Sequence, residues 1–376
     1  MTAITTGPQS PQEAPNIRVM IVDDSAVIRA VITRTLTPEQ GIEVVGTAPN
    51  GDLAVKAIAR LQPDIVVLDI EMPIMDGLTA LPLLLKEKPD VRVLICSTLS
   101  ARGADVTMKA LALGATDSIL KPGGESISSA ADFQRDLVRV IRVLGRPRKK
   151  YAPANHTNGA DAGTGAAKKL YPQTTVTLRP HKAPLPPKIL AIGSSTGGPK
   201  ALMDMLKGLK NFPLPIVITQ HMPKTFTAML AQHIEQNCGI PCFEGAEGMV
   251  LKPGSAYVAP GGLHMIFQKG TGEYPVIHLD SGPPENFCRP SVDVMLRSLV
   301  DIYGSRILTV ILTGMGSDGL EGCRKVVDNG GNVIAQDEET SIVWGMPGAV
   351  ATAGLCSAVQ PLSQLDVTIK KLVTGS

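Results

Sequence analysis

The feature that most constrains this sequence is a series of short, fully apolar runs that alternate with amphipathic helical patterns. An apolar run of about four to eight residues fits a strand buried on both faces, and such strands form parallel sheets covered by helices. The alternation therefore predicts an α/β fold whose ligands bind beyond the carboxyl ends of the strands. The predicted strands lie at residues 17–22, 65–68, 91–96, 118–120, 189–192, 216–220, 307–313 and 332–335, and the clearest helical patterns at 27–32, 201–209 and 292–303.

The length of 376 residues suits two domains joined by a connector. Between residues 146 and 188, Pro, Gly, Ala, Thr and Asn dominate, and nine Lys or Arg residues face a single acid, Asp161. Such a segment buries too little apolar surface to offset chain entropy, so it predicts a flexible, basic linker. A solvated tether is the default interpretation of its charge, and a docking role is the alternative. We expect a first domain at 17–140, the linker at 141–187 and a second domain at 188–376.

Composition excludes several classes of function. The net charge of +2 does not favour a nucleic-acid partner, since domains that bind nucleic acids usually carry a concentrated basic face. No apolar run approaches the ~20 residues that span a bilayer, and the first fifteen residues lack the features of a signal peptide. We therefore expect a cytoplasmic protein without direct membrane insertion. The six cysteines include no CxxC pair and are expected to be reduced and mostly buried.

Three carboxylates follow predicted strands of the first domain. Asp23 and Asp24 come after the first strand, and Asp69 comes after the strand at 65–68. Carboxylates that converge on one sheet edge repel one another unless a hard cation binds between them, so the pattern predicts a Mg²⁺ site. Ser97 and Lys121 follow two further strands and supply a hydroxyl and a cation that can contact a phosphoryl group. Helix capping by Asp24 or Ser25 would explain one such residue but not the whole set.

Over roughly residues 17–140, these positions resemble the response-regulator receiver family. The resemblance implies a flavodoxin-like domain in which a histidine kinase phosphorylates Asp69. It also implies that Asp23 and Asp24 bind Mg²⁺ together with Asp69, that Lys121 contacts the phosphoryl group, and that Ser97 senses it.

One position departs from this family's pattern. Ser118 lies three residues before Lys121, where many receivers have Tyr or Phe. An aromatic rotamer switch therefore does not follow from the resemblance. The signal is expected to pass mainly through Ser97 and the following loop at 98–99.

In the second domain, the strand at 189–192 runs directly into Gly-Ser-Ser-Thr-Gly-Gly, which matches G-x-S-x-G with Ser195 at its centre. A sharp turn between strand and helix exposes a serine hydroxyl, and the start of the helix offers N–H groups to an oxyanion. A glycine-rich turn before a helix also binds phosphate, so the motif alone leaves both interpretations open.

Two further residues favour hydrolysis. His221 directly follows the next predicted strand, and Asp318 follows a later one in LTGMGSDG. Serine needs a neighbouring base, and histidine needs an acceptor that fixes its tautomer, so Ser195, His221 and Asp318 fit the roles of nucleophile, base and orienting acid. The order Ser, His, Asp along the chain differs from that of α/β-hydrolases.

The motifs GSSTGG, QHMP, RPSVDVM and LTGMGSDG together resemble the catalytic domain of protein-glutamate methylesterases, across essentially residues 188–372. The resemblance implies a second doubly wound, Rossmann-like domain that hydrolyses glutamate γ-methyl esters on the cytoplasmic domains of chemoreceptors and releases methanol. The resemblance also implies that the ester hydrolysis needs no cofactor. Some members of the family also deamidate receptor glutamines, and this remains an additional activity to consider.

Three residues near these motifs are secondary candidates. Thr196 and Met315 are expected in the loops around the oxyanion, and Arg289 either contacts receptor carboxylates or is a surface residue at the start of a helix. A nucleotide-binding output domain is the main rival, but the chain lacks a lysine in P-loop spacing. A transcription regulator would require a helix-turn-helix with a basic recognition surface.

Overall fold

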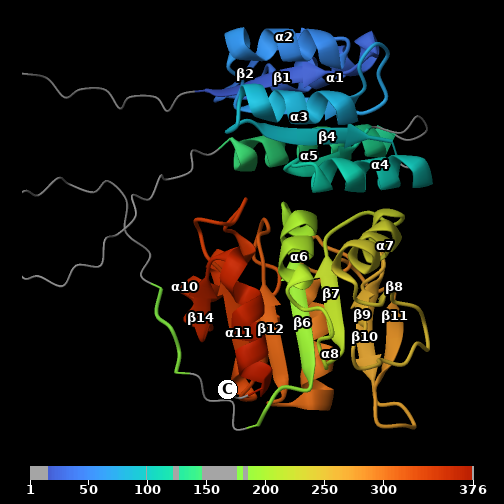
Figure 1. The fold of residues 1–376 in the computed structure, drawn as a ribbon, viewed down its shortest axis with the longest axis vertical. Helices are drawn as coiled ribbons and strands as arrows, with labels where there is room; N and C mark the ends of the chain where they lie inside the picture. The colour runs from blue at the N-terminus through green and yellow to red at the C-terminus, as the bar shows by residue number, and fades with distance from the viewer. Residues whose placement is uncertain (1–15, 99, 122–126, 146–175, 181–184, 375–376) are drawn as a thin grey trace, which may run out of the picture. The chain divides into compact units, whose positions relative to one another are not determined.

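The computed structural model describes residues 16–98, 100–121, 127–145, 176–180 and 185–374. These residues form two compact units (Figure 1) and contain a five-stranded sheet, a seven-stranded sheet and a two-stranded sheet. Most of the expected linker at 141–187, and Leu99 of the loop at 98–99, lie outside the described residues.

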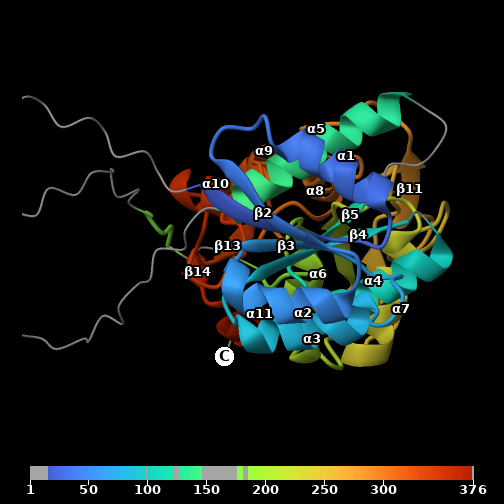
Figure 2. The same ribbon diagram turned by 90° about the horizontal axis from the view of Figure 1, so that it is seen from above.

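The first sheet has five strands in the order β2-β1-β3-β4-β5, and β1 pairs in parallel with both β2 and β3. This is the doubly wound, flavodoxin-like order, in which the strand order reverses between β1 and β3. Figure 2 shows α1 and α5 on one side of the strands and α2 and α3 on the other. The elements in chain order are β1 (Ile17–Val22), α1 (Ala26–Leu36), β2 (Ile42–Ala48), α2 (Gly51–Leu61), β3 (Ile65–Asp69), α3 (Gly77–Glu87), β4 (Arg92–Ser97), α4 (Ala101–Ala112), β5 (Asp117–Leu120) and α5 (Ile127–Leu144).

Short polar side chains begin the helices of this part of the chain. The side chains of Ser25, Asn50, Asp76 and Ser100 each accept a hydrogen bond from the backbone N–H three residues later, at 3.3, 3.0, 2.7 and 2.9 Å. Each therefore satisfies an N–H group that has no partner within the helix. Helix α5 continues to Leu144, four residues beyond the expected end of the first domain.

The second sheet has seven strands in the order β14-β13-β12-β6-β7-β9-β8, and all of its neighbouring strands pair in parallel. In Figure 1, α6 and α11 lie in front of β6 and β12, and α8 lies behind. The elements in chain order are β6 (Ile189–Ser194), α6 (Gly198–Lys207), β7 (Ile216–Gln220), α7 (Phe226–Cys238), β8 (Cys242–Glu244), β9 (Ala256–Val258), β10 (His264–Gln268), β11 (Val276–Asp280), α8 (Val292–Tyr303), β12 (Ile307–Ile311), α9 (Leu320–Asp328), β13 (Asn332–Gln336), α10 (Met346–Thr352), β14 (Ala358–Gln360) and α11 (Leu362–Thr374).

The burial of the central strands explains why they could be predicted from the sequence. Every residue of β6, β7, β12 and β13 is buried, so each strand is mostly apolar, with Thr309 inside β12 and polar residues otherwise at or next to the strand ends. Helix α8 packs its apolar side chains, such as Leu296 and Leu299, into the same core. Burying a side chain of this size contributes about 1.5–3 kcal/mol to stability. The α/β fold with two doubly wound, mainly parallel sheets is confirmed.

The strand order also fixes where ligands are expected in the second sheet. The chain starts at β6, adds β7, β9 and β8 on one side, and then returns to place β12, β13 and β14 on the other. The order therefore reverses between β6 and β12, so ligands are expected at the loops beyond the carboxyl ends of these two strands. The antiparallel pair β10–β11 stands apart from this sheet.

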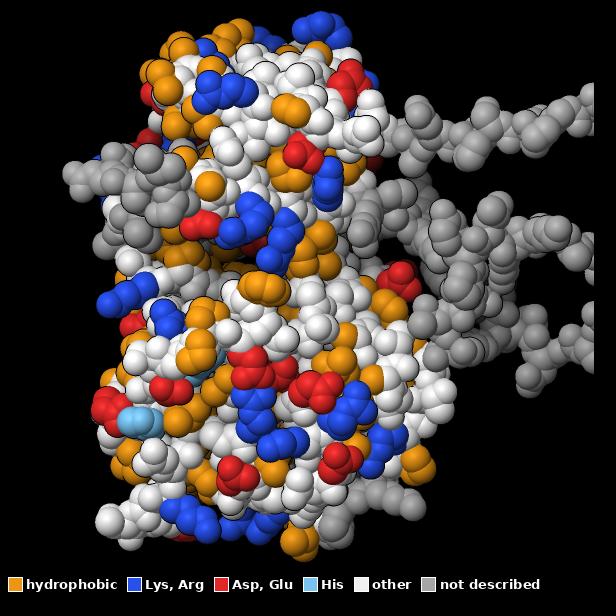
Figure 3. Space-filling model, turned by 180° about the vertical axis from the view of Figure 1, so that it is seen from behind, with side chains coloured by type: hydrophobic (Ala, Val, Ile, Leu, Met, Phe, Trp, Pro, Cys, Tyr) orange, Lys and Arg blue, Asp and Glu red, His pale blue; other side chains and the backbone are white. Residues whose placement is uncertain are grey.

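None of the helices in the described part of the chain combines the length and the apolar character that crossing a membrane requires. Over the face shown in Figure 3, the described acidic and basic side chains are interspersed rather than gathered by sign.

Candidate functional site

The carboxyl ends of β1 and β3 bring three acids together. Oxygen atoms of Asp23, Asp24 and Asp69 all lie within 4.8 Å of one another. Asp23 and Asp69 are 1% and 4% exposed, whereas Asp24 is exposed. The cluster sits where the strand order of the first sheet reverses, and a set of carboxylate oxygens open to solvent on one side suits a hard divalent cation such as Mg²⁺.

Backbone contacts position two of these acids. Asp23 accepts a hydrogen bond from the N–H of Ser25 at 2.9 Å, and Asp69 accepts one from the N–H of Ile70 at 2.8 Å. The capping interpretation is correct for Ser25, which begins α1, but it does not account for Asp69 at the end of β3.

Ser97 and Lys121 lie at the same edge of this sheet. Ser97 is the last residue of β4, which pairs with β3 so that Cys96 is opposite Asp69. Lys121 directly follows β5, and its N–H donates to the Ser97 carbonyl at 2.7 Å. The Ser97 hydroxyl is buried and has no hydrogen-bond partner among the described residues. A buried hydroxyl of this kind is costly unless a ligand uses it, so it fits contact with a phosphoryl group on Asp69.

Ser195 occupies the sharp turn between β6 and α6. Gly197 has a φ of +74°, which favours glycine, and a Cβ on Gly198 would lie 2.0 Å from Oε1 of Gln220. The Ser195 carbonyl accepts the N–H of Gly198 at 2.7 Å, and its N–H donates to the Thr313 carbonyl at 3.1 Å. The turn is thus tied to the loop after β12, and Ser195 is partly exposed at its crest.

A second residue, Gln220, ties this turn to the next one. Its side-chain N–H₂ donates to the carbonyls of Ser195 and His221 at 2.9 and 3.1 Å, and its Oε1 accepts the Ser194 hydroxyl at 2.6 Å. Gln220 is the last residue of β7 and is 1% exposed. Its role has no signal in the sequence, because it depends on the pairing of β6 with β7.

His221 and Asp318 form a close pair. Nε2 of His221 lies 2.7 Å from Oδ2 of Asp318, although the two residues are 97 positions apart. Burial by itself would lower the pKa of His221, but its contacts with Asp318 and Cys288 outweigh burial and raise the pKa to about 9. Burial would raise the pKa of Asp318, but the bond from His221 and those from Val292 and Ser291 lower it to about 2. The pair therefore favours an imidazolium beside a carboxylate.

Asp318 accepts hydrogen bonds from several other groups. The Ser291 hydroxyl donates to Oδ1 at 2.7 Å, and the Val292 N–H donates to Oδ2 at 2.7 Å. The Asn286 side chain and the N–H groups of Asp293 and Gly319 complete the set at 3.1, 3.2 and 3.1 Å on Oδ1. A carboxylate that is only 2% exposed and surrounded by donors stays ionised and in a fixed position.

The other nitrogen of His221 faces a residue that the sequence did not indicate. Nδ1 lies 3.5 Å from Sγ of Cys288, and no hydrogen bond joins the Ser195 hydroxyl to His221 within the described residues. All six cysteines are described and have free thiols, and Cys288 is the one that is not buried. The expectation that the cysteines are mostly buried is therefore confirmed.

Cys288 lies beside Nδ1 of His221 because of the path of the loop before α8. Asn286 and Phe287 adopt left-handed φ values of 53° and 62°, a region that is uncommon for Phe and more accessible to Asn. Phe287 is 96% exposed. Arg289 donates to the carbonyls of Ser281 and Gly282 at 2.9 and 2.8 Å, so its guanidinium holds this loop.

The two candidate oxyanion residues lie in the loops beside Ser195. The Thr196 carbonyl accepts the Thr313 hydroxyl at 2.9 Å, and Thr196 is 6% exposed. Met315 is half-buried and follows Gly314, where an added Cβ would lie 2.9 Å from Cβ of Ser195. Both loops therefore approach the crest of the Ser195 turn.

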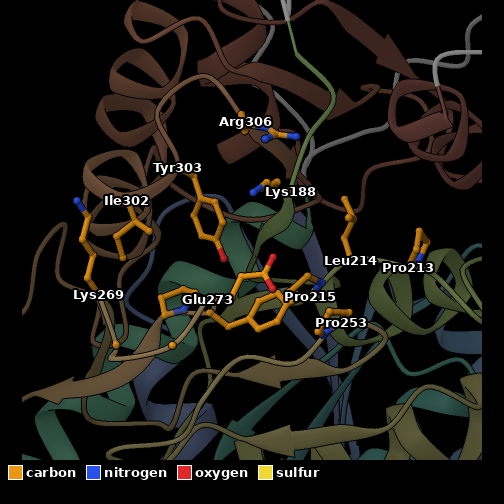
Figure 4. A pocket seen from close by; sticks show the side chains of 14 residues that line it. Lys188, Pro213, Leu214, Pro215, Pro253, Lys269, Glu273, Ile302, Tyr303 and Arg306 are labelled. Carbon is orange, nitrogen blue, oxygen red and sulfur yellow. The ribbon is translucent and has the colours of Figure 1, made fainter.

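A separate cavity of about 540 Å³ lies at the opposite edge of the second sheet. Lys188, Pro215 and Arg306 line it and precede β6, β7 and β12, whereas the candidate catalytic residues follow these strands. Figure 4 shows Tyr303 and Glu273 pointing toward its centre. Its position makes it unsuited to bind the substrate of Ser195.

Two family models match the chain. The response regulator receiver domain model matches residues 19–130, which include the acid cluster, Ser97 and Lys121. The CheB methylesterase model matches residues 190–369, which include Ser195, His221 and Asp318. Each family model therefore covers one of the two groups of candidate site residues.

Curated relatives match nearly the whole chain. The protein-glutamate methylesterase/protein-glutamine glutaminase of group 2 operon from Rhodospirillum centenum is 48% identical over 94% of this chain and 93% of its own. The protein-glutamate methylesterase/protein-glutamine glutaminase 1 of Paramagnetospirillum magneticum is 48% identical over 96% of this chain and 98% of its own. The crystal structure of the Thermotoga maritima CheB methylesterase catalytic domain is 42% identical, covers 50% of this chain and 100% of that chain, and has a TM-score of 0.49. On the near-complete match to the two relatives, the chain belongs to the family of protein-glutamate methylesterase/protein-glutamine glutaminases, hydrolases that carry a response regulator receiver domain and a CheB methylesterase domain.

Proposed function

We propose that this chain hydrolyses glutamate γ-methyl esters on the cytoplasmic domains of chemoreceptors, and that phosphorylation of its receiver domain activates the reaction. The observation that carries the proposal is the His221–Asp318 pair at 2.7 Å, at the same sheet edge as Ser195. The substrate comes from the relatives, which are named protein-glutamate methylesterases. The proposed division is a receiver at 17–140, a linker at 141–187 and a catalytic domain at 188–376, acting in the cytoplasm.

Ser195 is the proposed nucleophile. When its hydroxyl attacks the γ-carbonyl carbon, the proton passes to Nδ1 of His221, the nitrogen that is not bonded to Asp318. The bond to the methoxy oxygen then breaks, His221 returns the proton to the departing methanol, and the glutamyl group remains on Ser195 as an ester. Water, deprotonated by the same nitrogen, hydrolyses this ester to a free glutamate and restores Ser195.

Asp318 acts on His221 rather than on the substrate. Its carboxylate holds the Nε2 proton and stabilises the imidazolium that forms during each step. Because Nδ1 faces Cys288 in the structure, the Cys288 thiol must give up this contact before Nδ1 can serve Ser195.

The oxyanion that develops on the γ-carbonyl needs N–H donors. Helix α6 begins at Gly198, three residues after Ser195, and the positive end of its dipole is directed toward the turn. We propose that the loops that contain Thr196 and Met315 surround the oxyanion. Donors at such a position are typically worth 10²- to 10³-fold in rate, at roughly 2.7–4 kcal/mol.

Deamidation of receptor glutamines is the second activity within this proposal. The same attack on a γ-carbonyl, with ammonia in place of methanol as the leaving group, would use the same residues. Both relatives are also named protein-glutamine glutaminases, which favours this activity.

In the receiver, we propose that a histidine kinase phosphorylates Asp69. Asp23, Asp24 and Asp69 fit Mg²⁺, because their oxygens lie within 4.8 Å of one another. When bound, Mg²⁺ offsets the negative charge of the acids and of the phosphoryl oxygens. Lys121 and the Ser97 hydroxyl are the proposed contacts of the phosphoryl group.

The regulatory part of the proposal is that the unphosphorylated receiver restrains the esterase. A phosphoryl group adds negative charge and acceptor oxygens, and so shifts the receiver toward a second conformation. Because Ser118 stands where many receivers have an aromatic residue, the shift would depend mainly on Ser97.

Methanol release from methylated receptor tests the proposal. Full-length protein should release methanol, and Mg²⁺ with a small phosphodonor should increase the rate. The Asp69→Asn variant should keep the low rate and ignore the phosphodonor, whereas Asp52→Asn, a control on the surface of α2, should respond as the wild type does. Absence of methanol release from the wild type under all conditions would contradict the proposal.

A further inference from the structure

The contact between Cys288 and His221 points to a second property of the active site. We propose that the thiolate of Cys288 and Nδ1 of His221 bind Zn²⁺, and that bound Zn²⁺ inhibits the esterase reversibly. The inhibitory part rests on the proposed function, because it depends on His221 acting as the base. Binding of Zn²⁺ itself depends only on the arrangement of the side chains.

The two ligand atoms are at the separation that zinc requires. Zn–S and Zn–N bonds are about 2.3 and 2.0–2.1 Å, and a tetrahedral angle between them places sulfur and nitrogen about 3.6 Å apart. Sγ of Cys288 and Nδ1 of His221 are 3.5 Å apart. The two side chains can therefore bind one ion with little movement.

The tautomer of His221 also suits metal binding. Binding of Zn²⁺ displaces the proton that the imidazolium carries on Nδ1, whereas Nε2 keeps the proton that it donates to Asp318 at 2.7 Å. The lone pair freed on Nδ1 faces Cys288. A histidine that binds zinc commonly donates its other N–H to a carboxylate, which fixes the ring and increases its basicity. Asp318 holds that outer position firmly, since Ser291 and Val292 also donate to it at 2.7 Å.

Exposure and ligand chemistry decide which ion binds and how tightly. The His221 side chain is 13% exposed and Cys288 is partly exposed, so an ion can enter from solvent. Thiolate and imidazole select zinc over magnesium, whereas the acid cluster of the first sheet has only the oxygen ligands that magnesium prefers. With two protein ligands, and water in the remaining positions, binding should be readily reversible.

Zinc would inhibit catalysis because it would bind to the nitrogen that acts as the base. Nδ1 is the nitrogen that accepts the Ser195 proton in the proposed reaction. Zinc on Nδ1 removes the lone pair that acts as the base, while Ser195 and Asp318 keep their places. Zinc should therefore lower the rate of methanol release without unfolding the domain.

Binding is measured first on full-length Ser195→Ala protein, so that it does not depend on activity. The protein is treated with a chelator, and Mg²⁺ is added in excess to occupy the acid cluster. Zn²⁺ is then titrated against a chromophoric chelator. We expect one zinc ion per chain, and adding Cys288→Ala should weaken binding by at least about 10- to 100-fold. Adding Cys242→Ala, which removes a buried thiol of β8, should leave binding unchanged.

A second readout identifies the sulfur ligand. Co²⁺ in place of Zn²⁺ should give a thiolate-to-cobalt charge-transfer absorption that is absent when Cys288 is Ala. Equal zinc affinity with and without Cys288, or a cobalt complex without this absorption, would overturn the site.

Inhibition is then measured as methanol release by the wild type, with each variant compared with its own zinc-free rate. Zinc should inhibit the wild type, a chelator should restore the rate, and Cys288→Ala should need at least about tenfold more zinc for the same fractional loss. Full activity with zinc bound would overturn the inhibition. A zinc-free wild type that releases no methanol would instead overturn the proposed function, while zinc binding to Ser195→Ala would still support the site.

Discussion

Replacing Asp318 with Asn exchanges one carboxylate oxygen for an N–H₂ group at a position where every partner is a donor. Oδ2 accepts from Nε2 of His221 and from the Val292 N–H, both at 2.7 Å. Oδ1 accepts from the Ser291 hydroxyl at 2.7 Å, from Asn286 at 3.1 Å and from two backbone N–H groups. An N–H₂ group therefore faces a donor in either orientation of the amide.

The less costly orientation keeps the amide oxygen on the Oδ1 side, where four donors converge, and turns the N–H₂ group toward His221 and Val292. The Val292 N–H then loses its acceptor, and a buried donor without a partner costs about 1–3 kcal/mol. His221 can accept from the amide only in the other tautomer, with the proton on Nδ1, and it then has no lone pair for Ser195. A wrong tautomer and an unstabilised imidazolium reduce turnover on the order of 10⁴-fold, or about 5 kcal/mol in the activation barrier.

The assay compares the methanol release and the denaturant midpoint of Asp318→Asn with those of Asp328→Asn, a control at the exposed end of α9. Both variants should fold, and Asp318→Asn should lose about 1–3 kcal/mol of stability together with nearly all turnover. A rate for Asp318→Asn within tenfold of the wild type would refute the role assigned to the His221–Asp318 pair.

Three other predictions concern pH, regulation and receptor contact. Because the pKa of His221 is raised to about 9, the fraction of His221 in its base form increases as the pH rises toward that value. In chelator-treated protein, kcat/KM should therefore rise up to about pH 9. A profile that is flat from pH 6 to 9 would contradict this prediction. Ser97→Ala should weaken activation by a phosphodonor while leaving the unstimulated rate unchanged, and activation equal to that of the wild type would exclude Ser97 as the sensing residue. Phe287, which is 96% exposed beside the active site, should contact the receptor. Phe287→Ala should therefore raise KM for methylated receptor but not for a small ester. Equal changes in KM for both substrates would exclude that contact.

The sequence was sufficient to predict the central strands and the edge at which the candidate residues meet. The strands at 189–192, 216–220 and 307–313 are buried on both faces, so their sequences are mostly apolar, and the residues after parallel neighbouring strands had to share an edge. The edge strand β2 was missed because Glu43 and Thr47 interrupt its apolar pattern, and β8 and β14 were missed because each has only three residues.

The contacts that depend on tertiary folding were beyond the sequence. The distance from Cys288 to His221 depends on the path of the loop before α8, in which Phe287 follows Asn286 in the left-handed region although Phe rarely adopts it. The role of Gln220 depends on the register between β6 and β7, which pairs it with Ser194. Neither property has a periodic signal in the chain.

The most direct test of the central claim asks whether Ser195 or Cys288 carries the chemistry, since both lie near His221 and only Cys288 contacts it in the structure. Methanol release from methylated receptor is measured for the wild type, Ser195→Ala and Cys288→Ala under identical zinc-free conditions, with circular dichroism to verify folding. The proposed function predicts that Ser195→Ala falls to background, a loss on the order of 10³-fold or more, while Cys288→Ala still releases methanol. Methanol release that survives in Ser195→Ala and disappears in Cys288→Ala would contradict it.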